Sequence, residues 1–201
     1  MASQKKIGLY FGTFNPIHIG HLTIANYLVE FSDLDEVWFV VTPHNPHKKK
    51  KTLLDDIHRL TMVRIAIEEY PKLKASTIEF DLPQPNYTVN TLAHLEEKFP
   101  EAHFCLIIGE DNLKSFHKWK NYEVILARYE LYVYPRVSEG SVEIQFKEHP
   151  KIHKIDAPIM ELSSTFIRNA IAKGKNIRPM VPQNVWEYLD EMNFYRTSGN
   201  T

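Results

Sequence analysis

The sequence predicts a Rossmann-like α/β fold, in which a doubly wound parallel sheet carries helices on both faces and a small helical part follows at the C-terminal end. Apolar runs alternate with helical patterns along most of the chain, and this alternation favours right-handed crossovers between parallel strands. The apolar runs are continuous and rich in β-branched and aromatic residues, as is typical of strands that are buried on both faces.

The first half of the chain supplies the first strands and helices of this pattern. The runs "IGLYF" and "EVWFVVTP" predict buried strands, and the second ends at Pro43. Between them, Leu22 and Ala25 lie on one apolar stripe of a helix and Phe31 on another, so this helix is expected to be covered on two sides. The expected elements are a strand at 7–11, a helix at 19–31, a strand at 37–41, a helix at 55–70, a more polar strand at 74–80 and a helix at 89–99.

The second half continues the alternation and then closes with helices. "AHFCLIIG" is the strongest strand pattern of the chain, and the sequence becomes irregular after Arg136. One late helix is expected to stop at Gly174, and the next to begin after Pro182. The expected elements are a strand at 102–109, a helix at 122–127, a strand at 130–134, a short strand at 152–155, and helices at 165–173 and 183–192.

Length and composition restrict the classes of protein to which the chain can belong. At 201 residues it suits one domain, with a Rossmann-like core at 1–160 and C-terminal helices at 161–201. A formal net charge of −1 argues against a nucleic-acid partner. Cys105 lies within an apolar run and is expected to be a buried hydrophobic residue. No apolar run has the length of a signal peptide or a membrane span, so we expect a cytoplasmic protein without a membrane partner.

The loop after the first strand, "FGTFNPIHIGH", has the features of an anion site. In an open parallel sheet, ligands bind beyond the carboxyl ends of the strands, where unpaired N–H groups at helix starts favour anions. His18 and His21 are three residues apart and are expected on one face of the first turn, and Gly20 leaves space there for phosphate oxygens. Gly12 would allow a close backbone approach, and Thr13 adds a hydroxyl group. Alternatively, the two histidines bind a metal or merely begin a helix.

A second stretch, "MELSSTFIRNAIAKGK", has the features of another anion site. Ser163 or Ser164 is a good N-cap, and Arg168 lies about one turn into the helix that follows. Hydroxyl groups, free N–H groups and a guanidinium group would meet at this helix start, where arginine offers paired donors to phosphate. Taken alone, the stretch is more typical of a plain capped helix with a surface arginine.

Together, these motifs resemble those of a known enzyme superfamily. "GTFNPIHIGH" resembles the HxGH signature of the nucleotidyltransferases in its fuller GxFxPxHxGH form, and "SSTFIR" resembles their SSTxIR signature. The GxGxxG and Walker motifs are absent from the sequence, which argues against hydride transfer and ATP hydrolysis. The resemblance implies that His18, His21 and Arg168 are catalytic. It also implies an ATP site formed by Gly12, Thr13, Phe14, Gly20, Gly109, Asp111, Ser164 and Thr165.

The middle of the chain is similar to the bacterial nicotinate mononucleotide adenylyltransferases. "PHK" and "PNYTVNTL" resemble the PHK and SYTxDTL elements of that family, although Asn86 and Asn90 replace Ser and Asp. Thr88 is a plausible N-cap, and the helix start behind it could bind the carboxylate that distinguishes nicotinate from nicotinamide. Trp119, in a GxDxxxxFxxW pattern, either lies over the cationic pyridinium ring or is a packing residue. The implied substrate-binding residues are His47, Lys48, Tyr87, Thr88, Trp119 and Arg136.

The family resemblance implies transfer of AMP from ATP to nicotinate mononucleotide, giving nicotinate adenine dinucleotide and pyrophosphate in NAD biosynthesis. Mg²⁺ would be carried by the ATP phosphates, because few carboxylates flank the motifs, and we expect no metal site of the protein itself. Arg136 is a candidate phosphate ligand only, since Val137 and Ser138 break the match to the family's Arg-Pro-Gly. The alternatives are an adenylyltransferase for nicotinamide mononucleotide or phosphopantetheine, or a catalytically silent nucleotide-binding module. A homo-oligomer is left open.

Overall fold

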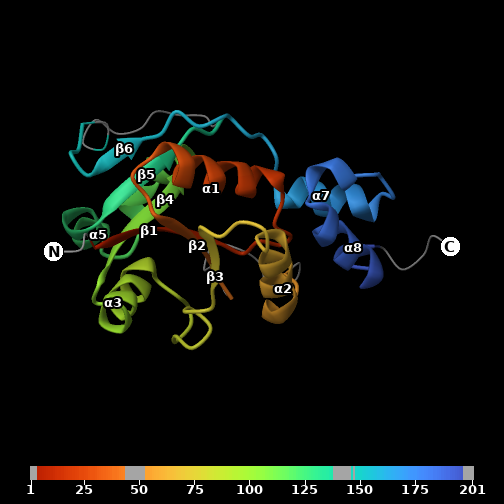
Figure 1. The fold of residues 1–201 in the computed structure, drawn as a ribbon, viewed down its shortest axis with the longest axis horizontal. Coiled ribbons are helices and arrows are strands. Elements are labelled where there is room, and N and C mark those ends of the chain that lie inside the picture. The colour runs from red at the N-terminus through yellow and green to blue at the C-terminus, as the bar shows by residue number, and fades with distance from the viewer. Residues whose placement is uncertain (1–3, 44–52, 138–145, 147, 197–201) are drawn as a thin grey trace.

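A six-stranded parallel sheet organises the protein (Figure 1). The structure is a computed structural model that describes residues 4–43, 53–137, 146 and 148–196. The strands are β1 (Lys5–Gly12), β2 (Glu36–Val41), β3 (Leu73–Ser76), β4 (Ala102–Gly109), β5 (Glu130–Tyr134) and β6 (Ile152–Lys154). Their order, β3-β2-β1-β4-β5-β6, is that of a doubly wound sheet and confirms the predicted fold class.

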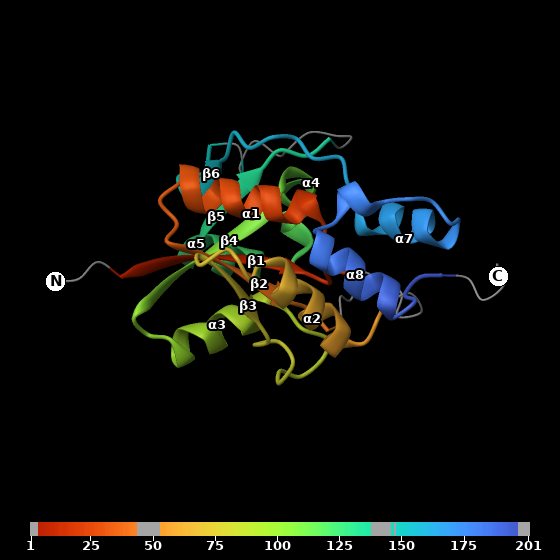
Figure 2. The same cartoon turned by 45° about the vertical axis from the view of Figure 1, so that its right-hand side comes forward.

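Helices cover both faces of this sheet (Figure 2). One buried cluster joins α1 and α2 to one face, and a second joins α3, α4 and α5 to the other. Successive residues of β1 serve opposite faces, with Leu9 in the second cluster and Tyr10 in the first. The helices are α1 (Ile19–Phe31), α2 (Asp56–Ala66), α3 (Thr88–Lys98), α4 (Glu110–Lys114), α5 (Tyr122–Arg128), α7 (Ser164–Ala172) and α8 (Gln183–Glu191), with short 3₁₀ helices η2 (Phe116–Lys118) and η3 (Arg178–Met180).

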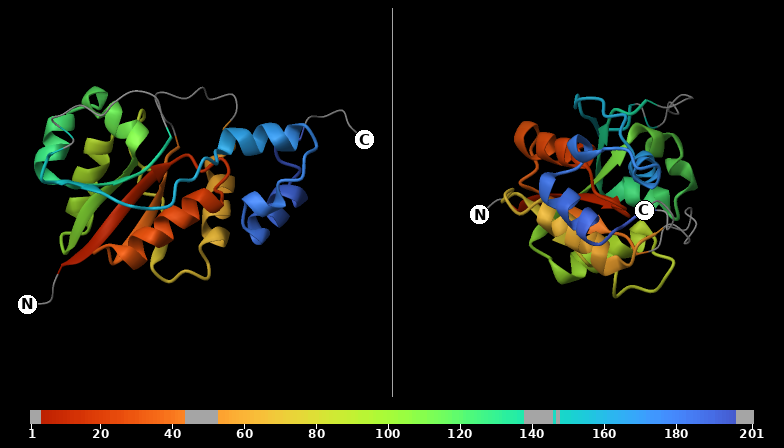
Figure 3. Two further views of the ribbon diagram at one scale, coloured as in Figure 1. Left: turned by 90° about the horizontal axis from the view of Figure 1, so that it is seen from above. Right: turned by 90° about the vertical axis from the view of Figure 1, so that its right-hand side faces the viewer.

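The C-terminal helices extend the first cluster past the edge of the sheet. Ile167 of α7 and Leu189 of α8 are buried in the same cluster as residues of α1 and α2. The hydroxyl group of Tyr188 on α8 lies 2.8 Å from Nδ1 of His58 on α2, which fixes α8 to that helix. Figure 3 shows both helices at the end of the molecule away from the N-terminus, where β1 ends. The last motif of the chain is therefore held near the carboxyl ends of the strands.

The predicted elements are present, with differences at their ends. The strand predicted at 74–80 is wrong after Ser76, because the chain turns there and the N–H of Phe80 donates to the carbonyl of Thr77 at 2.8 Å. The helix predicted at 55–70 ends earlier, at Ala66. The short helices α4, η2 and η3 were not predicted. Each has five residues or fewer, too short for helical periodicity to appear in the sequence.

Two expectations about single residues have opposite outcomes. Phe31 at the end of α1 is 72% exposed, so the prediction that α1 is covered on both of its apolar stripes is wrong at this end. Cys105 is buried, as predicted. Within the part of the chain that the structure describes, no helix is long and apolar enough to cross a membrane.

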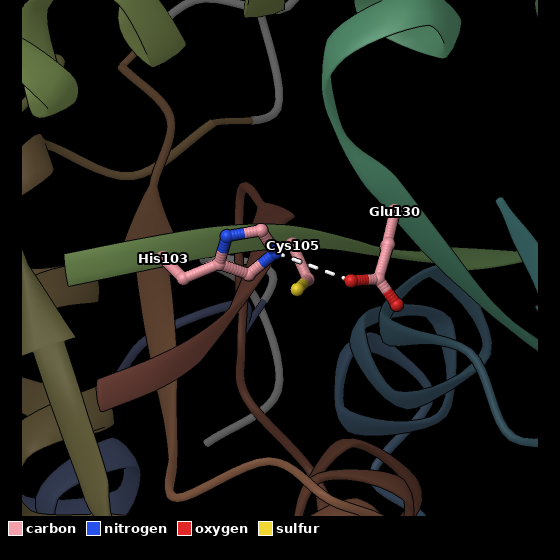
Figure 4. Close-up of side chains that lie close together, drawn as sticks. All are labelled: His103, Cys105 and Glu130. Atoms are coloured by element: carbon pink, nitrogen blue, oxygen red, sulfur yellow. Dashed lines mark hydrogen bonds and ion pairs between the residues drawn. The ribbon is translucent and has the colours of Figure 1, made fainter. Parts of the chain in front are cut away.

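Cys105 belongs to a polar cluster at the edge of the sheet where the strands begin (Figure 4). His103, Cys105 and Glu130 are residue types that can bind metals, and their ligand atoms lie within 4.8 Å of one another. However, Nζ of Lys6 lies 3.0 Å from Oε2 of Glu130 and already supplies a cation to this carboxylate. Burial raises the pKa of the Cys105 thiol to about 12, so the thiol is protonated at neutral pH. We therefore interpret the cluster as an ion-pair network and assign no metal to it.

Glu130 is the centre of this network. Nε2 of His103 lies 3.2 Å from its Oε1, and Nε2 of His153 lies 2.6 Å from its Oε2. Burial alone would raise the pKa of Glu130, but the hydrogen bond and the charge of Lys6 outweigh it and lower the pKa. A carboxyl group with a lowered folded-state pKa contributes stability above its ordinary pKa of 4.5, and this contribution is lost as the pH falls through the lowered value.

We predict that Glu130→Gln lowers the free energy of unfolding by about 1 kcal/mol at pH 7, because charge-assisted hydrogen bonds are lost at a partly exposed site. Urea unfolding of both proteins measures the difference, which should narrow as the pH falls below 4.5 and the wild-type carboxylate is protonated. Glu101→Gln, at an exposed carboxylate before β4, serves as the control. A difference that does not change with pH would contradict this interpretation.

Candidate active site

The sequence motifs meet at the carboxyl edge of the sheet, beside the point where the strand order reverses between β1 and β4. A pocket opens there, and its walls come from the end of β5, the start of α1 and the segment before α7. Its lining residues are Tyr10, His18, Gly20, His21, Ile24, Tyr134, Pro135, Arg136, Met160 and Leu162. The structure thus brings both signature histidines and Arg136 to one cavity.

The two histidines form a fixed pair at the start of α1. His18 is the N-cap, in extended conformation, and its backbone N–H donates to Nδ1 of His21 at 3.2 Å. The two imidazole rings stack with their centroids 3.7 Å apart. Because Nδ1 of His21 accepts this hydrogen bond, the proton of its neutral ring lies on Nε2.

His18 is nearly fully buried, and its environment disfavours a charge. Burial lowers its pKa to about 3, and the positive charge of Arg136 contributes to the shift. The ring is therefore neutral at pH 7. Nδ1 of His18 has no hydrogen-bond partner among the described residues.

Glycines in the signature make room for these rings and for a buried phenylalanine. A Cβ at Gly20 would lie 3.1 Å from Nδ1 of His18, and a Cβ at Gly12 would lie 2.8 Å from the ring of Phe14. Phe14 has a φ of 44° and is only 2% exposed, packed against the rings of Tyr10 and Phe39. Its side chain is therefore part of the core, and only its backbone could meet the predicted ATP.

A buried arginine that the sequence analysis missed holds the first loop (residues 13–18) in place. Arg59 of α2 is 0% exposed, and its Nη1 donates to the carbonyls of Thr13 at 2.7 Å and Thr42 at 2.9 Å. Its Nε donates to the carbonyl of Leu54 at 3.0 Å, and Nη2 pairs with Asp56. One guanidinium group thus joins the loop after β1, the end of β2 and the segment before α2.

The second motif also holds this loop. Ser163 caps α7 by accepting from the N–H of Phe166 at 3.2 Å, which confirms one of the two predicted caps. Ser164 Oγ donates to the carbonyl of Pro16 at 2.8 Å, and Arg168 Nη1 donates to the carbonyl of Asn15 at 2.8 Å. The two motifs, 153 residues apart at this last contact, therefore form one structural unit.

Arg168 and Asn15 have further partners in this unit. Arg168 Nη2 donates to Oγ1 of Thr165 at 3.2 Å. The hydroxyl group of Tyr195 donates to Oδ1 of Asn15 at 2.7 Å, and the N–H of Leu54 donates to the same oxygen at 3.3 Å. Part of the donor capacity of Arg168 is thus used to position the loop, a role that the sequence analysis did not include.

Gly109 and Asp111, two further residues of the predicted ATP site, lie beside residues that line the pocket. Asp111, in the first turn of α4, is so close to the backbone that a Cβ at Gly109 would lie 2.3 Å from its Oδ1. Arg136 and Tyr134 border the same glycine, at 3.0 and 3.3 Å from that Cβ position. Any side chain larger than that of glycine at residue 109 would therefore displace this carboxylate.

Of the predicted acceptor residues, Arg136 lines this pocket, whereas Tyr87, Thr88 and Trp119 do not and lie at or near the start of α3. The N-cap of α3 is Tyr87, so the prediction that Thr88 is the cap is wrong; Thr88 is the first helical residue. Nζ of Lys120 lies 4.2 Å from the centroid of the Tyr87 ring. Trp119 is half-buried, with its ring 5.3 Å from that of Phe116. His47, Lys48 and the lysines after them lie outside the described residues.

Comparisons with known proteins agree with these motifs. The cytidylyltransferase-like family model matches residues 9–170, from β1 to α7. A probable nicotinate-nucleotide adenylyltransferase of Christiangramia forsetii is 66% identical over 193 residues, which are 96% of this chain and 100% of that protein. One of Bacteroides fragilis is 48% identical over 93% of this chain and 92% of that protein.

Solved structures share the fold. The nicotinic acid mononucleotide adenylyltransferase of Plasmodium falciparum, solved in complex with NaAD, superposes with a TM-score of 0.80 at 21% identity, over 95% of this chain and 97% of that chain. A putative nicotinate-nucleotide adenylyltransferase of Vibrio parahaemolyticus gives a TM-score of 0.71 at 24% identity, over 96% of this chain and 97% of that one. At these identities the likeness shows the fold alone.

We predict that Arg59→Met lowers the free energy of unfolding by about 3 kcal/mol, because three carbonyl groups lose their buried donor. Urea unfolding measures the change. Arg64→Met provides the control, since Arg64 is an exposed arginine on the same helix and its loss should change stability by less than about 0.5 kcal/mol. Equal effects of the two substitutions would show that Arg59 does not hold the loop.

Proposed function

The chain belongs to the nicotinate-nucleotide adenylyltransferase family, within the cytidylyltransferase-like proteins, and we propose that it transfers the adenylyl group of ATP to nicotinate mononucleotide. The products are nicotinate adenine dinucleotide and pyrophosphate. The observation that carries this proposal is the contact of Arg168 and Ser164 with the loop that precedes His18 and His21, because it brings the two candidate phosphate-binding motifs together. The histidines line the pocket, whereas Arg168 and Ser164 are not among its lining residues.

The proposed reaction requires that the two reacting phosphates be aligned and that the charge on the leaving pyrophosphate be stabilised. In the proposed step, an oxygen of the acceptor phosphate forms a bond to the α-phosphorus of ATP, and the bond from that phosphorus to the bridging oxygen of pyrophosphate breaks. The acceptor oxygen is already ionised at neutral pH, so no strong general base is needed. Catalysis then rests on holding the two phosphates in line and on stabilising the charge that moves to pyrophosphate.

We assign the donors as follows. His18 is neutral at pH 7, so it would serve as a hydrogen-bond donor to phosphate and not as a cation. His21, with the proton of its neutral ring on Nε2, would donate to the same group. Arg168, together with Ser164 and Thr165 at the start of α7, would hold the β- and γ-phosphates.

The rest of the ATP site is proposed on the adjoining backbone. Gly12, Thr13, Phe14 and Gly20 would contact ATP mainly through their main-chain groups, and the carboxylate of Asp111 beside Gly109 would accept hydrogen bonds from ribose hydroxyl groups. None of the described residues that line the pocket carries a carboxylate, which fits a divalent cation that is bound by phosphate oxygens and enters with ATP. We propose Mg²⁺ as this ion.

The acceptor site is proposed at the start of α3. Free N–H groups there, beside Tyr87 and Thr88, would bind the nicotinate carboxylate, and Trp119 would lie over the pyridinium ring. Arg136 would hold the acceptor phosphate, with His47 and Lys48 contributing from outside the described residues. The proposal concerns a cytoplasmic, single-domain enzyme whose partners are small molecules.

A coupled assay of pyrophosphate release tests the function. We predict release when ATP is mixed with nicotinate mononucleotide and much slower release with nicotinamide mononucleotide.

His18→Ala and His21→Ala should each lower kcat on the order of 10²-fold or more, as for other lost transition-state donors. His94→Ala, at a surface histidine of α3, is the control and should keep wild-type turnover. Near-normal turnover of the His18 and His21 variants would refute their roles.

The acceptor site has its own test. We predict that Thr88→Ala and Trp119→Ala each raise KM for nicotinate mononucleotide by roughly 10-fold, the order of one or two lost contacts, while KM for ATP changes little. Trp186→Ala on α8 removes a comparably half-buried tryptophan and controls for lost packing. If the variants change only the KM for ATP, the acceptor site is assigned to the wrong residues.

A further inference from the structure

A buried carboxyl group lies between β3 and α3, outside the pocket described above. Glu79 is 2% exposed, and its Oε1 accepts from the hydroxyl group of Thr91 at 2.7 Å. Its Oε2 has no hydrogen-bond partner among the described residues. A fully buried glutamate is rare in proteins because its desolvation is costly, so its presence here indicates a specific task.

Glu79 forms hydrogen bonds with a residue just before α3 and with a residue in the first turn of α3. Its main-chain carbonyl accepts from Nδ2 of Asn86 at 2.9 Å, and Asn86 directly precedes the N-cap Tyr87. Its side chain holds Thr91, which lies one turn into the helix and whose N–H donates to the carbonyl of Tyr87 at 3.2 Å. Glu79 therefore fixes the residue before the cap and the turn after it, with Tyr87 and Thr88 between them.

The carboxyl group also interacts with the end of β2. Burial raises the pKa of Glu79, while the hydroxyl groups of Thr91 and Thr42 oppose this rise. Thr42 follows the last residue of β2, and its N–H donates to the carbonyl of Gly12 at 2.9 Å. Thr42, whose hydroxyl group influences this carboxyl group, thus lies at the carboxyl edge of the sheet, where the first loop begins.

The amide groups at a helix start bind an anion only if they point at it, so a support that fixes their direction affects affinity. We propose that Glu79 is a positioning residue of the acceptor site, which sets the affinity for the mononucleotide by fixing residues 86–88 against the turn that follows β3. This inference rests on the proposed function, because it requires the acceptor to bind at the start of α3. Glu79 acts as a hydrogen-bond acceptor in this role, and its charge is not required.

The test compares Glu79→Ala, Glu79→Gln and Thr91→Val by steady-state kinetics with ATP and nicotinate mononucleotide, together with thermal unfolding. Glu79→Ala removes the acceptor oxygen and should raise KM for nicotinate mononucleotide about 10-fold, with KM for ATP and kcat within about twofold of wild type. Glu79→Gln keeps an acceptor oxygen of nearly the same shape and should restore KM to within about threefold of wild type.

Thr91→Val removes the donor with little change of shape, and it keeps the proposal testable if Glu79→Ala does not fold. It should raise KM for the mononucleotide as Glu79→Ala does. The double variant, Glu79→Ala with Thr91→Val, should have a KM no higher than that of either single variant, because both substitutions remove the same contact. Asp81→Ala, at an exposed carboxylate two residues further along the same turn, is the matched control and should be kinetically silent.

Three outcomes would overturn the proposal: an unchanged KM for the mononucleotide in folded Glu79→Ala and Thr91→Val, equal rises in both KM values, or a Glu79→Gln variant as impaired as Glu79→Ala. The proposed function fails in a different way, which is the absence of pyrophosphate release by the wild-type enzyme with ATP and nicotinate mononucleotide. The two failures are therefore distinguishable in the same set of measurements.

Discussion

The site depends on how the peptide carbonyl groups of the first loop are held. Thr13, Asn15 and Pro16 each present a carbonyl to a side chain from a helix: Thr13 to Arg59 of α2, Asn15 to Arg168 of α7 and Pro16 to Ser164 of α7. In a planar trans peptide group, the N–H points opposite to the carbonyl, so these contacts also orient the N–H groups of Phe14 and Ile17. The loop that precedes the histidines is thus fixed by donors far apart in the sequence.

This arrangement explains why a charged side chain is buried beneath the loop. Burial lowers the pKa of Arg59, whereas the charge of Asp56 opposes the shift, and arginine stays protonated because its ordinary pKa is so high. The desolvation cost of the guanidinium group is offset by its bonds to three carbonyls and one carboxylate. A lysine could not make these four contacts, because all of its N–H donors are on a single nitrogen atom.

Much of the fold could be predicted from the sequence because the strands are continuous apolar runs. The two candidate phosphate-binding motifs could also be found, because each consists of residues that are close together in the sequence. What failed was the assignment of single residues whose role depends on a partner far along the chain. Arg59 and Arg64 both interrupt the apolar pattern of α2, and only the carbonyls of Thr13 and Thr42 single out Arg59 as the buried one. Likewise, Thr88 resembles a cap in sequence, but α3 begins with Thr88 and leaves Tyr87 as the cap.

The pocket combines a neutral imidazole, that of His18, with the positively charged guanidinium group of Arg136. His18 is stacked on His21 and lies within the field of Arg136, and with a pKa of about 3 its ring carries no positive charge at neutral pH. In the proposed reaction, the positive charge that opposes the phosphates therefore has to come from Arg136, from Arg168 and from the cation bound to ATP. In the same proposal, the imidazoles of His18 and His21 would add directed hydrogen bonds. Because a neutral donor attracts the substrate's net charge less than a cation does, His18 can favour the transition state without holding pyrophosphate too tightly for release.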